Sequence, residues 1–157
     1  MKFINIELKA SDLLYQLTPE EIDEFHKCSE DIIYFVEKYC RFLTDKGRVL
    51  VSLRDYQKKI LLVLAEEHYI ETLKEFGPKN RNIITLASRQ VGKTTTIAAF
   101  FSWYMCFHND RNLAILANKE KTAFEIVSKV TDVFKGLTFF LKPGIISIGY
   151  GGMRLDN

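Results

Sequence analysis

The middle of the chain combines three features that few folds accommodate in succession. The run Asn82-Ile83-Ile84-Thr85-Leu86-Ala87 is apolar and β-branched, as in a strand buried on both faces, and such strands belong to parallel sheets. A polar turn over residues 88–95 and an apolar helix over residues 96–107 come next. Residues 113–117 form a second apolar run, followed by an amphipathic helix. This order predicts an α/β fold with a mainly parallel sheet flanked by helices.

The polar turn carries the clearest chemical signal. The string Ala87-Ser88-Arg89-Gln90-Val91-Gly92-Lys93-Thr94-Thr95 matches the phosphate-loop pattern G-x-x-x-x-G-K-[ST] from Gly92 to Thr94, with Ala87 at the first glycine position. Backbone N–H groups opening a helix converge on an anion there, favoured by the helix dipole. Lys93 would place an ammonium beside the phosphates of ATP, and the Thr94 hydroxyl would ligate Mg²⁺. The alternative is a plain strand-turn-helix corner with a solvated Lys93.

Arg89 lies inside this turn. An arginine beside the γ-phosphate stabilises the charge that spreads over its oxygens during phosphoryl transfer, here from within the same chain. The alternative is an arginine that pairs with a surface carboxylate.

A second constellation lies upstream, in Leu53-Arg54-Asp55-Tyr56-Gln57 at the head of a predicted helix. The Gln57 amide can both donate to and accept from the edge of adenine, and Tyr56 can pack against the base. The segment resembles the adenine-recognising Q-motif of helicases and related motors. The alternative is an exposed Gln57 in the first helical turn, with Tyr56 in the core.

The remaining elements are predicted by local patterns. Thr18-Pro19-Glu20-Glu21 forms a capping box that starts a helix near Pro19. Residues 29–45 and 55–76 repeat apolar side chains at helical spacing. Residues 145–148 and 153–156 flank a glycine-rich turn, which predicts a hairpin.

Composition excludes several classes. The 157 residues suit a single domain, and a net charge of +2 is too small to indicate nucleic-acid or membrane binding by itself. The lysines on helices are spread as on solvated faces. The three cysteines and three histidines show no zinc spacing, and residues 1–15 lack a signal-peptide core, so we expect a reduced protein that is not secreted. The longest apolar stretch is too short to cross a bilayer.

Several segments together resemble the ATPase domain of the large terminase subunit, the DNA-packaging motor of tailed bacteriophages. Residues 31–39 look like the helix ahead of the adenine motif, residues 53–57 like that motif, and residues 88–95 like the family's deviant P-loop, which tolerates loss of the first glycine and carries an arginine. Residues 113–118, Pro143-Gly144-Ile145 and Leu155-Asp156-Asn157 resemble family segments that come after the P-loop.

The resemblance implies a RecA-like P-loop core over residues 49–157, preceded by a helical segment over residues 1–48, within one partial ATPase domain. It implies ATP and Mg²⁺ as cofactors, with Thr94 on the metal and Arg89 and Lys93 as catalytic residues. The implied partners are double-stranded DNA, the portal protein and the small terminase subunit, in the cytoplasm of the infected host. The implied nucleotide-binding residues are Tyr56, Gln57, Ser88, Arg89, Gln90, Val91, Gly92, Lys93, Thr94 and Thr95.

The family's Asp-Glu strand and nuclease domain do not appear in this sequence. We therefore expect ATP binding without efficient hydrolysis, and an exposed sheet edge that favours self-association or a complementing C-terminal half. Two alternatives stay open: a superfamily-two helicase or restriction-translocase segment, and a non-catalytic terminase-like protein that binds a motor partner. Helicases usually keep a glycine where this chain has Ala87.

Overall fold

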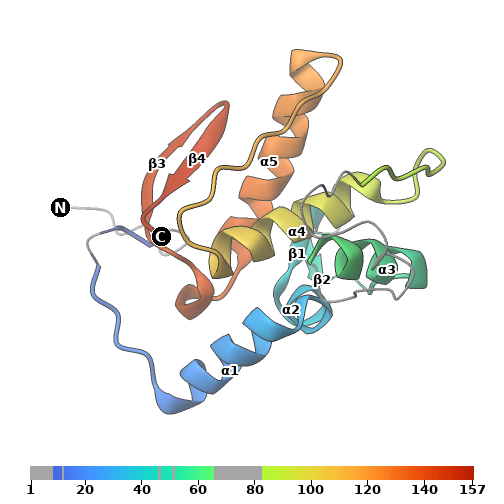
Figure 1. Ribbon diagram of the computed structural model, residues 1–157. Coiled ribbons are helices and arrows are strands. Elements are labelled where there is room, and N and C mark those ends of the chain that lie inside the picture. The colour runs from blue at the N-terminus through green and yellow to red at the C-terminus, as the bar shows by residue number, and fades with distance from the viewer. Residues whose placement is uncertain (1–8, 12, 46, 51, 66–82) are drawn as a thin grey trace.

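Five α-helices surround one core in the computed structural model, which describes residues 9–11, 13–45, 47–50, 52–65 and 83–157. In Figure 1, α4 lies in the middle of the molecule, among the other helices. The helices are α1 (Pro19–Glu30), α2 (Ile32–Tyr39), α3 (Asp55–Leu64), α4 (Lys93–Phe107) and α5 (Glu120–Gly136), with a 3-10 turn, η2 (Phe139–Leu141). The strands are β1 (Arg41–Thr44), β2 (Gly47–Leu50), β3 (Ile145–Gly149) and β4 (Gly152–Leu155).

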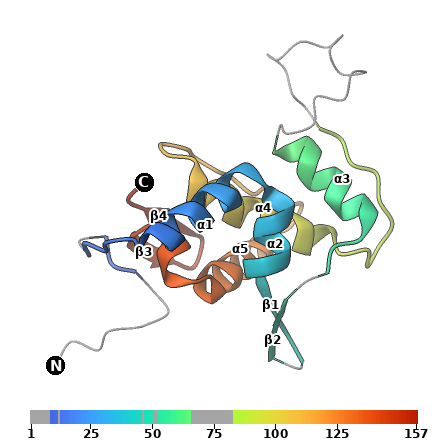
Figure 2. The same ribbon diagram turned by 90° about the horizontal axis from the view of Figure 1, so that it is seen from below.

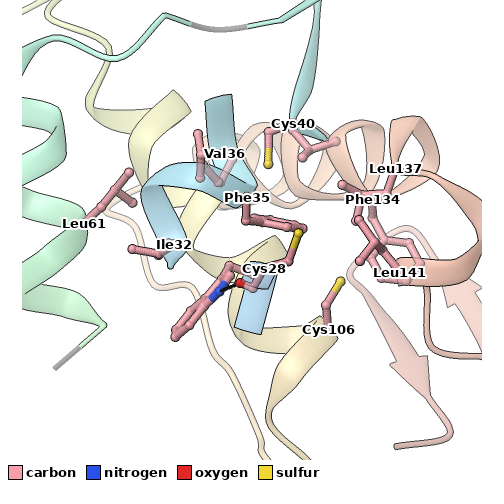
Figure 3. Close-up of a cluster of buried hydrophobic side chains, with 14 of the residues drawn as sticks. Cys28, Ile32, Phe35, Val36, Cys40, Leu61, Cys106, Phe134, Leu137 and Leu141 are labelled. Atoms are coloured by element: carbon pink, nitrogen blue, oxygen red, sulfur yellow. Dashed lines mark hydrogen bonds between the residues drawn. The ribbon is translucent and has the colours of Figure 1, made fainter. Parts of the chain in front are cut away.

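The core is helical, and α4 supplies its centre. The α4 sequence is apolar on most sides, as expected of a helix buried by neighbours all round. Figure 3 shows Phe35 and Cys28 facing the α5 side chain Phe134. Across this core the Trp103 indole N–H donates to the Cys28 carbonyl at 2.8 Å, which satisfies a buried polar group and ties α4 to α1.

The first helix begins where the sequence predicts. Thr18 Oγ1 accepts the Glu21 N–H at 3.2 Å and the Glu21 carboxylate accepts the Thr18 N–H at 2.9 Å, so the predicted capping box is confirmed. Asp31 ends α1 and caps α2, where its Oδ1 accepts the Tyr34 N–H at 2.9 Å. One aspartate thus turns the chain between two packed helices.

The predicted helix over residues 29–45 is wrong in its second half. After Tyr39 the chain forms an antiparallel hairpin, β1 with β2, which pairs Phe42 with Val49 and projects from the helices in Figure 2. In β1 only Phe42 is buried, so most of this strand faces solvent. Gly47, at φ +94°, lies in the turn of this hairpin. From the sequence, the same glycine was expected to end a helix.

The C-terminal hairpin is confirmed. β3 and β4 pair antiparallel with Ile148 opposite Met153, around the glycine-rich turn. The N-terminal arm adds to this hairpin, because Ala10 bridges to Ile145 in parallel and the Ile145 N–H donates to the Lys9 carbonyl at 2.7 Å. Sequence patterns did not predict that bridge.

The structure departs from the predicted central parallel sheet. Within the described chain, residues 83–87 and 113–117 belong to no helix or strand ladder, and the sheets are two antiparallel hairpins. Ile84, Leu86 and Leu116 are 94%, 100% and 95% exposed. The physical reason is that a strand needs hydrogen-bonding neighbours, and the described residues provide none beside these runs.

The predicted helix over residues 55–76 is seen as α3 up to Leu64. Residues 66–82, which include the rest of that prediction and Asn82, lie outside the described residues. Among the helices that are described, none has the length and apolar character needed to cross a bilayer.

Candidate phosphate-binding loop

The loop that leads into α4 is shaped by two left-handed residues. Gln90 has φ +61° and Gly92 has φ +82°, with Val91 between them. Gly92 adopts this conformation freely, whereas at Gln90 it costs about 1–2 kcal/mol. Left-handed residues in a tight turn bring successive backbone N–H groups to one side, which is the geometry of an anion-binding nest.

The first turn of α4 continues this concave row of donors. Gly92 is the N-cap, and the Thr96 N–H makes the bond that opens the helix, to the Gly92 carbonyl at 3.0 Å. Helical geometry leaves the N–H groups of Lys93, Thr94 and Thr95 without intrahelical acceptors, and Gly92 has no side chain to cap them. The positive end of the helix dipole lies at the same place. The N-terminus of α4 therefore presents donors that suit a phosphate.

Cationic side chains flank this turn. Lys93 is exposed, and its Nζ donates to the Ala87 carbonyl at 2.8 Å, so the ammonium crosses the mouth of the loop. Arg89 is exposed at the tip and makes no ion pair with any carboxylate in the described part of the chain. Both cationic side chains therefore lie on the loop. The alternative for Arg89, a surface ion pair, is not seen among the described residues.

The two residues of the predicted adenine motif lie against the loop. The Tyr56 hydroxyl donates to the Val91 carbonyl, and Gln57 is buried, at 6% exposure. Gln57 Oε1 accepts the Arg54 N–H at 3.0 Å, which closes the first turn of α3. The alternative of an exposed Gln57 is therefore wrong. The structure brings together two motifs that are far apart in the sequence, as the resemblance implies.

Sequence reasoning missed Thr96, which connects these two parts. The Gln57 Nε2 donates to Thr96 Oγ1 at 3.0 Å, and the Thr96 hydroxyl donates to the Gly92 carbonyl at 3.1 Å. Thr96 shares the buried face of α4 with Ala99 and Trp103. That spacing was the available signal, because a hydroxyl on an apolar helix face must find a partner.

A cavity lies elsewhere in the fold. It has a volume of about 860 Å³ and is bordered by the C-terminal half of α4, residues 110–115, α5 and the C-terminal hairpin. Its lining mixes apolar side chains such as Phe101, Phe124 and Met153 with charged ones such as Arg111 and Asp156. None of the predicted nucleotide-binding residues lines it, so the cavity is not part of the candidate site.

The cysteine thiols belong to the core. Cys28, Cys40 and Cys106 are all buried (Figure 3). Burial raises the pKa of Cys28 to about 12 and raises the pKa values of Cys40 and Cys106 as well. Thiolates are the reactive form, so these side chains are inert packing groups. In the described chain, no three His, Cys, Asp or Glu side chains are grouped to hold a metal ion.

Residues 84–152 match the family model described as terminase large subunit, T4likevirus-type, N-terminal. The matched segment contains the loop, α4, α5 and β3. The match confirms the resemblance to large terminase subunits that the sequence predicts for this part of the chain. Tyr56 and Gln57 lie outside the matched residues.

Proposed function

We propose that this chain, which carries the N-terminal region of a phage terminase large subunit over residues 84–152, binds ATP with Mg²⁺ at the loop before α4. The bound nucleotide would drive a motor that couples ATP hydrolysis to DNA translocation into a procapsid. The observation that carries the proposal is the N-terminus of α4, where no side chain caps the first N–H groups and Lys93 lies in the same turn.

The chain's side chains divide the work of holding the nucleotide. Lys93 exchanges the Ala87 carbonyl for phosphate oxygens, a small movement because its ammonium already lies across the loop. The Thr94 hydroxyl, in the first turn of α4, supplies a ligand for Mg²⁺. Mg²⁺ held there would neutralise part of the negative charge of the phosphates. Arg89, exposed in the loop, would reach the terminal phosphate.

The base would lie on the side of the loop that faces α3. Tyr56 is half-buried against Val91, and Gln57 lies beneath the loop with one amide hydrogen beyond its bond to Thr96. Tyr56 and Gln57 therefore lie next to the loop that would hold the phosphates. This position supports the adenine pocket that the resemblance implies.

We also propose that residues 83–87 and 113–117 are strands of a RecA-like sheet when their edges are paired. Both runs are apolar and mostly exposed, a combination that water disfavours and that pairing removes. A second copy or a complementing C-terminal half would supply the neighbours. In the whole motor, double-stranded DNA, the portal protein and the small terminase subunit are the partners, in the cytoplasm of the infected host.

Titration with a fluorescent ATP analogue and Mg²⁺ tests nucleotide binding. The parent chain is expected to bind, and Lys93→Ala to weaken binding at least about tenfold, because a charged hydrogen bond contributes roughly 1.5–3 kcal/mol. Lys129→Ala, which removes an exposed lysine from α5, is the matched control and should bind like the parent. A parent that does not bind, or equal binding by Lys93→Ala, would refute the proposal.

A further inference from the structure

Thr96 occupies the one place where α3, the loop and α4 meet through a single hydroxyl group. That hydroxyl accepts from Gln57 Nε2 at 3.0 Å and donates to the Gly92 carbonyl at 3.1 Å. Thr96 is fully buried, so water does not compete for either bond. We propose that Thr96 is a positioning residue that fixes the phosphate-binding shape of the loop; this rests on the nucleotide site proposed above.

One planar peptide unit links Thr96 to the phosphate site. The Gly92 carbonyl and the Lys93 N–H belong to the same trans peptide and point in opposite directions. Both the backbone N–H and the hydroxyl of Thr96 hold the Gly92 oxygen toward the helix. The Lys93 N–H is thereby directed out of the helix end. Fixing this peptide before a ligand arrives reduces the ordering cost of binding.

Gln57 gives the same peptide a second anchor. Its Oε1 is held by the Arg54 N–H and its Nε2 by Thr96, so the side chain has one defined position beneath Gly92. A shift of α3 therefore moves Thr96 and the loop together. In this arrangement Gln57 acts on the phosphate end of the nucleotide through Thr96, in addition to any contact with the base.

Two probes separate this role from base recognition. Mg²⁺ with ATP carries a base, whereas Mg²⁺ with inorganic tripolyphosphate carries only the phosphates, and calorimetry measures both affinities. Thr96→Val keeps the shape of the side chain but loses the hydroxyl. We expect this variant to lower the affinity for both probes by about five- to tenfold. Thr96→Ser keeps the hydroxyl and is expected to bind within about twofold of the parent.

Thr131 on α5 offers a matched control. Its hydroxyl donates to the Val127 carbonyl at 3.0 Å, the same kind of bond within a helix that Thr96 makes, and the residue lines the cavity beside α5. Thr131→Val should leave both affinities unchanged. If Thr96→Val fails to fold by circular dichroism, Gln57→Ala removes the other partner and should weaken tripolyphosphate as well as ATP.

The outcomes are distinguishable. A folded Thr96→Val that binds tripolyphosphate like the parent overturns the inference while leaving nucleotide binding intact. Loss of ATP affinity alone in Gln57→Ala also overturns it, because that result assigns Gln57 to the base. A parent chain that binds neither probe overturns the proposed function itself.

Discussion

The side-chain nitrogen of Gln57 lies 2.9 Å from the point where a Cβ atom on Gly92 would stand. Gly92 also has φ +82°, a conformation that side chains with a Cβ rarely adopt. Two independent constraints thus require glycine at this position. The phosphate-loop pattern and the packing of Gln57 from α3 therefore both require glycine at position 92.

Gly92→Ala is therefore expected to be costly. The left-handed backbone alone costs about 1–2 kcal/mol, and the methyl group displaces the Gln57 amide from Thr96. We expect a lower free energy of unfolding in urea and weaker ATP binding. Gly149→Ala is the control, because its Cβ meets nothing within 4 Å and its φ is ordinary. Equal stability of the two variants would contradict this account of the loop.

Local patterns predicted much of the fold. The capping box at Thr18, the loop and helix around Gly92 and the hairpin with Ile148 opposite Met153 were all readable, because each depends on residues close together in sequence. Residues 41–44 were misread as helix because apolar spacing there suits both a helix and a hairpin strand.

Long-range relationships were harder. The hydrogen bond from Gln57 to Thr96 joins residues 39 positions apart, and neither local sequence indicates that the other is its partner. The predicted sheet is not seen among the described residues for a related reason, since burial of Leu86 or Leu116 depends on neighbours that local sequence does not specify. The resemblance to the family predicted that the adenine motif and the P-loop lie close together. It did not predict that the Thr96 hydroxyl joins them.

Arg89→Ala is predicted to affect the transition state more than the ground state. An exposed arginine at the loop tip gains most from the charge that develops on a transferring phosphoryl group. Mg²⁺, ADP and aluminium fluoride mimic that state. We expect the variant to lose at least about tenfold more affinity for this mimic than for ATP. Arg89→Lys should recover only part of the lost affinity, because lysine lacks the planar guanidinium group that donates two parallel hydrogen bonds. Equal losses for the two ligands would exclude an in-chain arginine finger.

Leu86→Lys is predicted to reduce self-association without loss of stability. Leu86 is fully exposed, so its replacement should change the free energy of unfolding by less than about 0.5 kcal/mol. If residues 83–87 pair with another copy, the added charge opposes that pairing. Sedimentation velocity gives the oligomeric state. Leu14→Lys, at an equally exposed leucine in the N-terminal arm, is the control. The edge hypothesis fails if both variants associate like the parent.

A polar cluster joins α1 to α2 around Glu24. Its Oε1 accepts from Lys38 Nζ at 2.6 Å, Tyr39 at 2.7 Å and Tyr34 at 2.8 Å. The bond from Lys38, with those from the two tyrosines, lowers the pKa of Glu24 from 4.5 to about 2 against the opposing effect of burial. The bond to Glu24 raises the pKa of Lys38.

The lowered pKa of Glu24 makes the stability of this cluster depend on pH. A lowered carboxyl pKa contributes stability that is present above pH 4.5 and is lost as the pH falls toward about 2. Glu24→Gln should lower the free energy of unfolding at pH 7 by about 1–2 kcal/mol, since Lys38 is partly exposed. The variant's stability should also fall less between pH 4.5 and about 2 than the parent's. Glu125→Gln, at an exposed position on α5, is the control, and matching acid profiles for parent and Glu24→Gln would contradict the prediction.

The central claim is that the amides at the start of α4 hold a triphosphate, and backbone NMR tests it most directly. ¹⁵N-labelled chain is titrated with Mg²⁺ and ATP, then with Mg²⁺ and tripolyphosphate, while each amide is followed. We predict that the largest shifts fall on Gly92, Lys93, Thr94 and Thr95 with both ligands. Unchanged amides at those positions under saturation, or largest shifts around the cavity between α5 and the C-terminal hairpin, would contradict the account.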